Sequence, residues 1–140
     1  MESSQYDIAI VGGGILGLST AMQLLERAPH WRVAVVEKEE GLATHQTGHN
    51  SGVMHSGIYY RPGSHKAQFC VAGLNNMVKF CEENEIEFQQ CGKVIVAIHE
   101  SELGRLQDLY ERGTANGVPD LEIVGPERLK EIEPHTAGVK

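Results

Sequence analysis

Near its N-terminus the chain reads YDIAIVGGGILGLSTAMQLLERAPHWRVAVVE, residues 6–37. A short apolar run rich in β-branched residues stops at three glycines, which is typical of a buried strand in a parallel sheet. Apolar residues then recur at helical spacing as far as Pro29, and a second apolar run follows at residues 32–37. Strand, glycine turn, helix and strand in this order predict a βαβ unit and an α/β, Rossmann-like fold.

The glycine turn has the spacing of a dinucleotide-binding motif, Gly12-x-Gly14-x-x-Gly17. Gly12 permits the tight turn, Gly14 lets a pyrophosphate approach the backbone, and Gly17 lets the helix pack against the strand. The start of the helix offers unpaired N–H groups to the phosphates. Glu37, at the end of the second strand, can accept both hydrogen bonds of an adenosine ribose, which favours FAD or NAD over NADP. The alternative is a glycine-rich turn without a ligand.

Residues 41–63 form a long segment rich in Gly, His, Asn and Ser. Ordered loops of this length usually carry function. A nicotinamide-binding unit would continue into further strands and helices, so this loop favours FAD, with loop amides against the pyrophosphate and the flavin ring. His45, His49 and His55 have no Asp, Glu or Cys among them, and the glycines oppose a helix that would align them. We therefore predict no metal site.

The composition narrows the function classes further. The chain has 140 residues and a net charge of −7, with 41% hydrophobic and 22% charged residues, as in an ordinary soluble domain. An acidic chain without a basic stripe argues against nucleic acid as a partner. No apolar run is long enough to span a membrane, and the N-terminus lacks the pattern of a secretory signal, so we expect a cytoplasmic protein. Cys70, Cys81 and Cys91 suit a reducing compartment and are expected in the core.

The remaining residues predict further elements. Ser64 is a candidate N-cap for a helix whose apolar stripe includes Cys70 and Met77. A strand is expected at 93–98, paired with 87–90, and a helix capped by Ser101 follows it. A strand at 121–124 and a short helix at 126–132 complete the chain. The expected organisation is a dinucleotide unit at 1–40, a flavin-contacting loop at 41–63, and helices with the start of a substrate-side sheet at 64–140.

At residues 43–60, ATHQTGHNSGVMHSGIYY, the sequence closely resembles the FAD-dependent L-2-hydroxyglutarate dehydrogenases (oxidases), which belong to the wider class of D-amino-acid-oxidase-like flavoproteins. Pro62-Gly63-Ser64 and Cys91-Gly92-Lys93 continue the resemblance, which extends over nearly the whole chain. His65 departs from the Leu expected there, and Arg61 falls at a variable position. Since members of this family are much longer, we expect this chain to be the N-terminal, incomplete part of an FAD-binding domain. Alone, it should hold FAD weakly and self-associate.

The resemblance implies oxidation of L-2-hydroxyglutarate to 2-oxoglutarate with hydride transfer to FAD. His55 is the candidate base for the hydroxyl proton, because a neutral imidazole suits that task at physiological pH. A structural histidine that fixes the loop is the alternative. Tyr59 and Tyr60 are candidate substrate residues, of which a strand would turn only one toward the cavity. The candidate cofactor-binding residues are Gly12, Gly14, Ile15, Leu16, Gly17, Glu37, Lys38, Thr47, Asn50, Ser51, Gly52 and Val53.

Two other functions remain open. Another 2-hydroxy-acid or amino-acid oxidase of the same class would share these motifs, and a chain of this length could be an inactive FAD- or ADP-binding module. The flavin would supply the redox chemistry, and the protein would supply orientation and electrostatics. Oxygen or a membrane quinone would accept the electrons, and with a quinone the complete enzyme would lie peripherally at the inner membrane.

Overall fold

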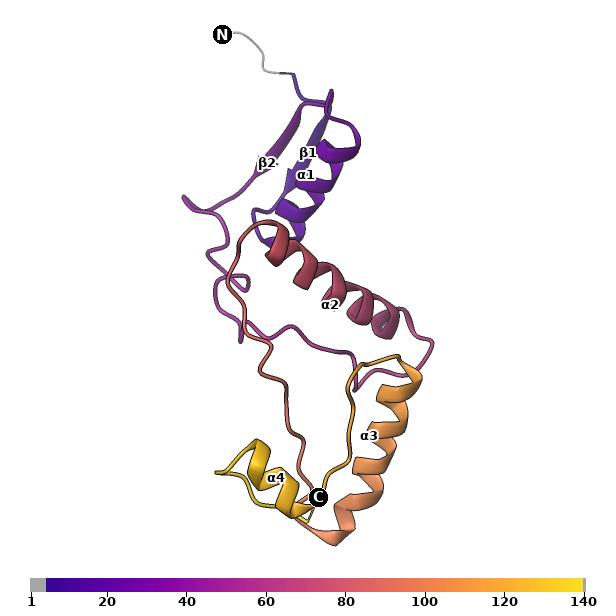
Figure 1. Cartoon of the computed structure of the whole chain (residues 1–140). Helices are drawn as coiled ribbons and strands as arrows, with labels where there is room; N and C mark the ends of the chain where they lie inside the picture. Colours follow the sequence, from indigo (N-terminus) through magenta and orange to yellow (C-terminus); the bar gives the residue numbers. More distant parts are fainter. Residues whose placement is uncertain (1–4, 140) are drawn as a thin grey trace. The chain divides into compact units, whose positions relative to one another are not determined.

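The computed structural model describes residues 5–139 and divides the chain into two compact units, Met1–Gly52 and Val53–Lys140 (Figure 1). The first unit contains both strands found in the described residues, and the second contains helices joined by extended segments. The unit boundary falls inside the loop predicted at 41–63. That loop therefore belongs partly to each unit.

The first unit is the predicted βαβ element. Strand β1 (Ile8–Val11) leads through the glycine turn into helix α1 (Ile15–Arg27), and strand β2 (Val33–Val36) follows. The two strands are parallel, with Ile8 opposite Val33 and Val11 opposite Val36. In Figure 1, α1 lies beside this two-stranded sheet. The α/β prediction and the order of these elements are confirmed.

Hydrogen bonds at both ends of the sheet hold its register. At the start, the Asp7 carboxylate accepts from the Arg32 backbone N–H at 2.7 Å and from the Arg32 Nε–H at 3.4 Å. These bonds from Arg32, the backbone one first, lower the pKa of Asp7 below its ordinary value. At the other end, the Gly12 N–H donates to the Val36 carbonyl at 2.8 Å. The strands are therefore paired right up to the glycine turn.

Helix α1 approaches β1 closely because position 17 has no side chain. A Cβ at Gly17 would overlap the carbonyl oxygen of Gly12 and press against Ile10. One turn further along, Ala21 is buried. Leu16, a predicted cofactor-binding residue, is 80% exposed in the first turn of the helix.

Replacing Gly17 with alanine is expected to lower the free energy of unfolding by about 1–3 kcal/mol, because the new methyl group meets backbone that cannot rotate away. The matched control is Gly73→Ala in helix α2 (His65–Glu83), where a Cβ meets no atom within 4 Å. That change should stabilise the protein by roughly 0.5–1 kcal/mol, as alanine does inside a helix. Urea unfolding followed by circular dichroism measures both. A Gly17→Ala protein as stable as the parent would contradict this packing.

In the second unit, α2 begins as predicted, because the Ser64 hydroxyl accepts from the Ala67 N–H at 3.3 Å. Ala67 and Cys81 on this helix are buried. The expected stripe is only partly correct, since Met77 is 37% exposed and Cys70 is half-buried. Cys91, expected in the core, is exposed and lies outside the helices.

The later helices are a 3₁₀ turn, η1 (Glu100–Glu102), then α3 (Leu103–Ala115) and α4 (Pro126–Ile132). Helix α4 has the predicted bounds. The predicted cap at Ser101 is wrong, because the Glu102 carboxylate accepts from the His99 N–H at 3.1 Å and Ser101 lies inside the 3₁₀ turn. At Gly113 of α3, a Cβ would crowd Ile58 and Leu121, so this glycine lets both side chains pack against the helix.

The segments predicted as strands at 87–90, 93–98 and 121–124 are not paired as strands within residues 5–139. These segments are extended, but among residues 5–139 they form no ladder with one another or with any other segment. The Ala97 carbonyl accepts one bond, from the Val139 N–H at 2.8 Å. An apolar run becomes a strand only where a neighbour meets its backbone groups, and here Ile98 remains 63% exposed.

Candidate functional site

The glycine turn leaves the N-terminus of α1 open. Gly12 has a positive φ of 108°, a conformation that favours glycine, and Gly14 is the extended N-cap of the helix. The first helical bond runs from the Leu18 N–H to the Gly14 carbonyl at 2.9 Å. Within residues 5–139, the amides of Leu16 and Gly17 donate to no acceptor, and the first turn contains no acid. Unpaired amides at a helix start form a site that attracts anions.

Thr47 from the loop lies at the same helix start. Its Oγ1 accepts from the Ile15 N–H at 3.0 Å, across 32 residues of sequence. A Cβ at Gly14 would lie 3.2 Å from this oxygen, so glycine is what lets Thr47 come close. The tertiary structure thus brings together Gly14, Ile15 and Thr47, three of the residues predicted to bind the cofactor.

Glu37 also lies against the glycine turn. Its Oε2 accepts from the Gly13 N–H at 2.6 Å, and its Oε1 accepts from the N–H groups of Lys38 at 2.8 Å and Glu39 at 3.2 Å. The Gly13 bond first, and then the other two, lower the pKa of Glu37 below its ordinary value of 4.5. A carboxylate accepts about four hydrogen bonds. Three of the acceptor positions of Glu37 are occupied by backbone N–H groups, so one position is left for a ribose hydroxyl. The sequence motif predicts that Glu37 accepts hydrogen bonds from two ribose hydroxyls.

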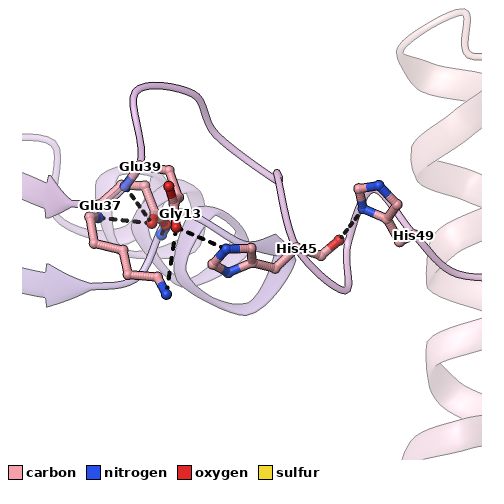
Figure 2. A network of polar contacts seen from close by, with 6 residues as sticks. Gly13, Glu37, Glu39, His45 and His49 are labelled. Atoms are coloured by element: carbon pink, nitrogen blue, oxygen red, sulfur yellow. Dashed lines mark hydrogen bonds and ion pairs between the residues drawn. The ribbon is translucent and has the colours of Figure 1, made fainter.

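The loop between Gly41 and Gly52 is fastened by its own polar side chains. His45 Nε2 lies 3.0 Å from Glu39 Oε1, and the His45 carbonyl lies 2.9 Å from His49 Nδ1 (Figure 2). Asn50 donates to the carbonyls of Gln46 and Thr47, and its Oδ1 accepts from the Gly52 N–H at 2.7 Å. These bonds fold the loop into successive turns, and Thr47 lies among them.

Two of these contacts were not predicted from the sequence. Gly13 occupies an unspecified position of the motif, yet a Cβ there would lie 2.6 Å from a Leu42 methyl group and 3.1 Å from the Glu37 carboxylate. Gly13 is the middle one of three consecutive glycines, and this run was the available signal. Glu39 has no motif to mark it, and only the path of the loop brings His45 to it. Lys38, a predicted cofactor residue, has its Nζ 3.5 Å from Glu39.

His55 and Val53 belong to the second unit. The His55 side chain is exposed, and its ring makes no hydrogen bond within the described part of the chain, whereas the rings of His45 and His49 each have a partner. The His55 backbone carbonyl accepts from the Cys70 thiol at 3.1 Å. The backbone at His55 is therefore held, while its imidazole remains available for another group.

Tyr59 and Tyr60 lie in a turn, so the strand alternation assumed for them does not apply. Two side chains from the end of α3 hold this turn. Arg112 donates to the Tyr59 carbonyl at 3.2 Å, and the Asn116 amide donates to the carbonyls of Gly57 at 3.0 Å and Tyr60 at 2.9 Å. The Tyr59 hydroxyl accepts from Lys93 Nζ at 3.1 Å.

Other features of the described residues add little to the site. A hollow of about 320 Å³ lies against α3, lined by Leu103, Leu106, Gln107 and Ile123 among others, and none of the predicted site residues lines it. Within residues 5–139, no group of His, Cys, Asp or Glu is arranged to hold a metal ion. No described helix combines the length and the apolar content needed to cross a bilayer.

The first unit fits the ADP half of FAD on its own geometry. It has two unpaired amides at a helix start, a Gly14 position where a side chain would crowd the approach, and a carboxylate at the end of β2 with one acceptor position unused. Comparison with known proteins agrees, since the model of the FAD dependent oxidoreductase (DAO) family matches residues 7–140. The chain belongs to this family.

Among relatives of this DAO-family chain, the mitochondrial L-2-hydroxyglutarate dehydrogenase of Nematostella vectensis is 53% identical over 137 residues, which are 98% of this chain and 30% of the relative. The human mitochondrial L-2-hydroxyglutarate dehydrogenase is 51% identical over 99% of this chain and 30% of its own length. The L-2-hydroxyglutarate dehydrogenase of Escherichia coli K12 is 50% identical over 96% of this chain and 32% of its own length.

The chain thus spans about 30% of the length of the relatives it matches. The resemblance predicted from residues 43–60 is confirmed, and so is FAD as the cofactor of the family.

Proposed function

We propose that this chain provides the ADP-binding part of a flavoenzyme that oxidises L-2-hydroxyglutarate to 2-oxoglutarate. The observation that carries the proposal is identity of about half over almost the whole chain to relatives named L-2-hydroxyglutarate dehydrogenase, in animals and in bacteria. The open helix start beside Gly14 and Thr47 supports it independently.

In this proposal each residue group has one task. The amides of Leu16 and Gly17 bind the pyrophosphate, Glu37 accepts a ribose hydroxyl, and Thr47 orients the helix start. Gly12, Ile15, Lys38 and the loop residues Asn50, Ser51 and Gly52 are proposed to shape the same surface of the first unit, and Val53, in the second unit, stays a candidate cofactor residue. When bound, FAD accepts the two electrons that leave the substrate.

His55 is the proposed base that takes the proton of the substrate hydroxyl. Its exposed imidazole, which makes no hydrogen bond within residues 5–139, supports this role over that of a structural histidine. A neutral imidazole nitrogen accepts a proton near neutral pH, which is what oxidation of an alcohol requires. Tyr59, at the turn held by α3, is proposed to contact the substrate, and Tyr60 is the second candidate.

The test is a chimera in which this chain replaces the matching segment of the E. coli K12 relative, which supplies the rest of its own sequence. We expect a purified protein that contains FAD and reduces an artificial electron acceptor with L-2-hydroxyglutarate. A chimera that contains FAD but prefers another 2-hydroxy acid, or an amino acid, would replace the proposed substrate. One that folds without FAD would reject the cofactor assignment.

Glu37 provides a prediction that depends on pH. Because its pKa is lowered in the folded chain, its carboxylate stabilises the glycine turn fully above pH 4.5, and this contribution is lost as the pH falls through the lower folded pKa. The NMR signal of the Gly13 amide should therefore move with a midpoint below 4.5, and Glu37→Gln should abolish the movement. Glu40→Gln, three residues along, is the control. If the Gly13 signal changed neither on acidification nor in Glu37→Gln, the contact between the Gly13 amide and Glu37 would be contradicted.

A further inference from the structure

The second unit presents a lysine and a tyrosine side by side on segments far apart in the sequence. Lys93 Nζ lies 3.1 Å from the Tyr59 hydroxyl oxygen and 4.8 Å from the centre of the Tyr59 ring. Both side chains are exposed. Lys93 follows Gly92, which has a positive φ of 73°, and Tyr59 lies in the turn that Arg112 and Asn116 hold.

The turn that contains Tyr59 is held by the side chains of Arg112 and Asn116, which make no other hydrogen bond in the described structure. Arg112 and Asn116 together make three bonds to carbonyls of residues 57–60, and the Tyr60 N–H closes the turn on the Gly57 carbonyl at 3.2 Å. Gly57 is buried with a φ of 90°. The turn is therefore held in place before any ligand arrives, which lowers the entropy lost on binding.

Lys93 is a cation without an anion. Among residues 5–139, no carboxylate lies within 4.0 Å of its ammonium group, although residues 82–140 contain thirteen acids and six bases. Lys79 on α2, by contrast, has Glu83 at 3.6 Å. An uncompensated ammonium group in an acidic segment can pair with an anion that comes from outside the chain.

The hydrogen-bonding capacity of the pair suits a carboxylate. The Tyr59 oxygen accepts from the ammonium group, so its own O–H remains available, and the ammonium group keeps two further N–H donors. Two donors, one of them charged, match the two oxygens of one carboxylate.

We propose that Lys93 and Tyr59 bind a carboxylate group of the substrate. This inference rests on the proposed function, in which the substrate is a dicarboxylate. The inference adds Lys93 to the residues proposed to bind the substrate, and it identifies a carboxylate as the substrate group that Tyr59 contacts.

The first experiment measures KM and kcat of the chimera for L-2-hydroxyglutarate, with flavin content recorded for every variant. Lys93→Met should raise KM roughly ten- to hundredfold, as expected for loss of a hydrogen bond to a charged group, with flavin content unchanged. Lys93→Arg should recover part of the loss, and Tyr59→Phe, which keeps the ring, should raise KM less. Lys79→Met is the matched control and should leave KM unchanged.

L-2-hydroxybutyrate, which lacks the second carboxylate, identifies the group that is bound. If Lys93→Met impairs both substrates, the pair binds the shared carboxylate. If it impairs only L-2-hydroxyglutarate, the pair binds the distal one, and either result supports the inference. An unchanged KM for both substrates in Lys93→Met and Tyr59→Phe would overturn it, while turnover by the parent chimera would still support the proposed function.

A second measurement needs no turnover. Glutarate titrated into this chain should shift the NMR signals of the Lys93 and Tyr59 side chains and leave Lys79 unmoved. If the chimera did not oxidise L-2-hydroxyglutarate, the proposed function would fail, and this titration would still decide whether the pair binds a dicarboxylate. If the NMR signals of Lys93 and Tyr59 did not shift when glutarate is added, the inference would be overturned.

Discussion

Replacing Gly14 with valine is expected to abolish FAD retention in the chimera. A Cβ at this position would already lie 3.2 Å from the Thr47 hydroxyl, and the two additional methyl groups of valine would extend into the space before the Leu16 and Gly17 amides. Overpacking of this kind costs about 1–3 kcal/mol, and loss of the amide contacts adds to that cost. Flavin absorbance per protein after gel filtration should fall below roughly a tenth of the parent value.

Gly125→Val is the matched control for this prediction. Gly125 is the N-cap of α4 with φ −78° and ψ 173°, nearly the same conformation as Gly14 with φ −84° and ψ −178°. A Cβ at Gly125 meets no atom within 4 Å. The flavin content of the Gly125→Val chimera should therefore equal that of the parent chimera. A Gly14→Val protein with full flavin content would show that the helix start is not the pyrophosphate site.

Replacing His55 with alanine is expected to slow reduction of the bound flavin by L-2-hydroxyglutarate by about 10²- to 10⁴-fold, the usual effect of removing a general base. Flavin content should be unchanged, because the His55 ring makes no hydrogen bond within residues 5–139 that its loss would break. Stopped-flow absorbance of the flavin, recorded at several pH values, measures the step directly.

His65→Ala provides the comparison, since that imidazole stacks on Phe69 at the start of α2 with ring centres 5.8 Å apart and has no proposed role in the reaction. Its reduction rate should match that of the parent. If His55→Ala reduced its flavin at the parent rate, His55 would be a structural residue, and the proton would have to go to another group.

Features encoded by neighbouring residues could be predicted from the sequence. The β1–α1–β2 order follows from apolar runs with two different periods on either side of the glycines, and Ser64 is a cap because it lies directly before the first apolar turn of α2. Helix α4 has the predicted bounds, and Pro126 suits the first position of a helix. In the helices the hydrogen bonds that define the element join residues a few positions apart, and the two strands are marked by apolar runs on either side of a contiguous glycine motif.

Features that depend on a distant partner could not be predicted. Residues 93–98 have the composition of a strand, but a strand needs a neighbour to pair with, and the described structure provides none. At the glycine turn, the motif predicts an acid at Glu37, but only the folded chain places its carboxylate on the Gly13 amide and uses three of its acceptor positions.

The sequence by itself therefore determined the βαβ unit, its glycine turn and the family, because these depend on local periodicity and on a contiguous motif. Only the tertiary structure decided that Thr47 lies at the start of α1 and that Lys93 lies against Tyr59. It also decided that, within residues 5–139, the ring of His45 makes a hydrogen bond and that of His55 makes none. These contacts join residues 6 to 34 positions apart. Such contacts depend on the path of the chain between the two residues, and a local pattern of side chains does not encode that path.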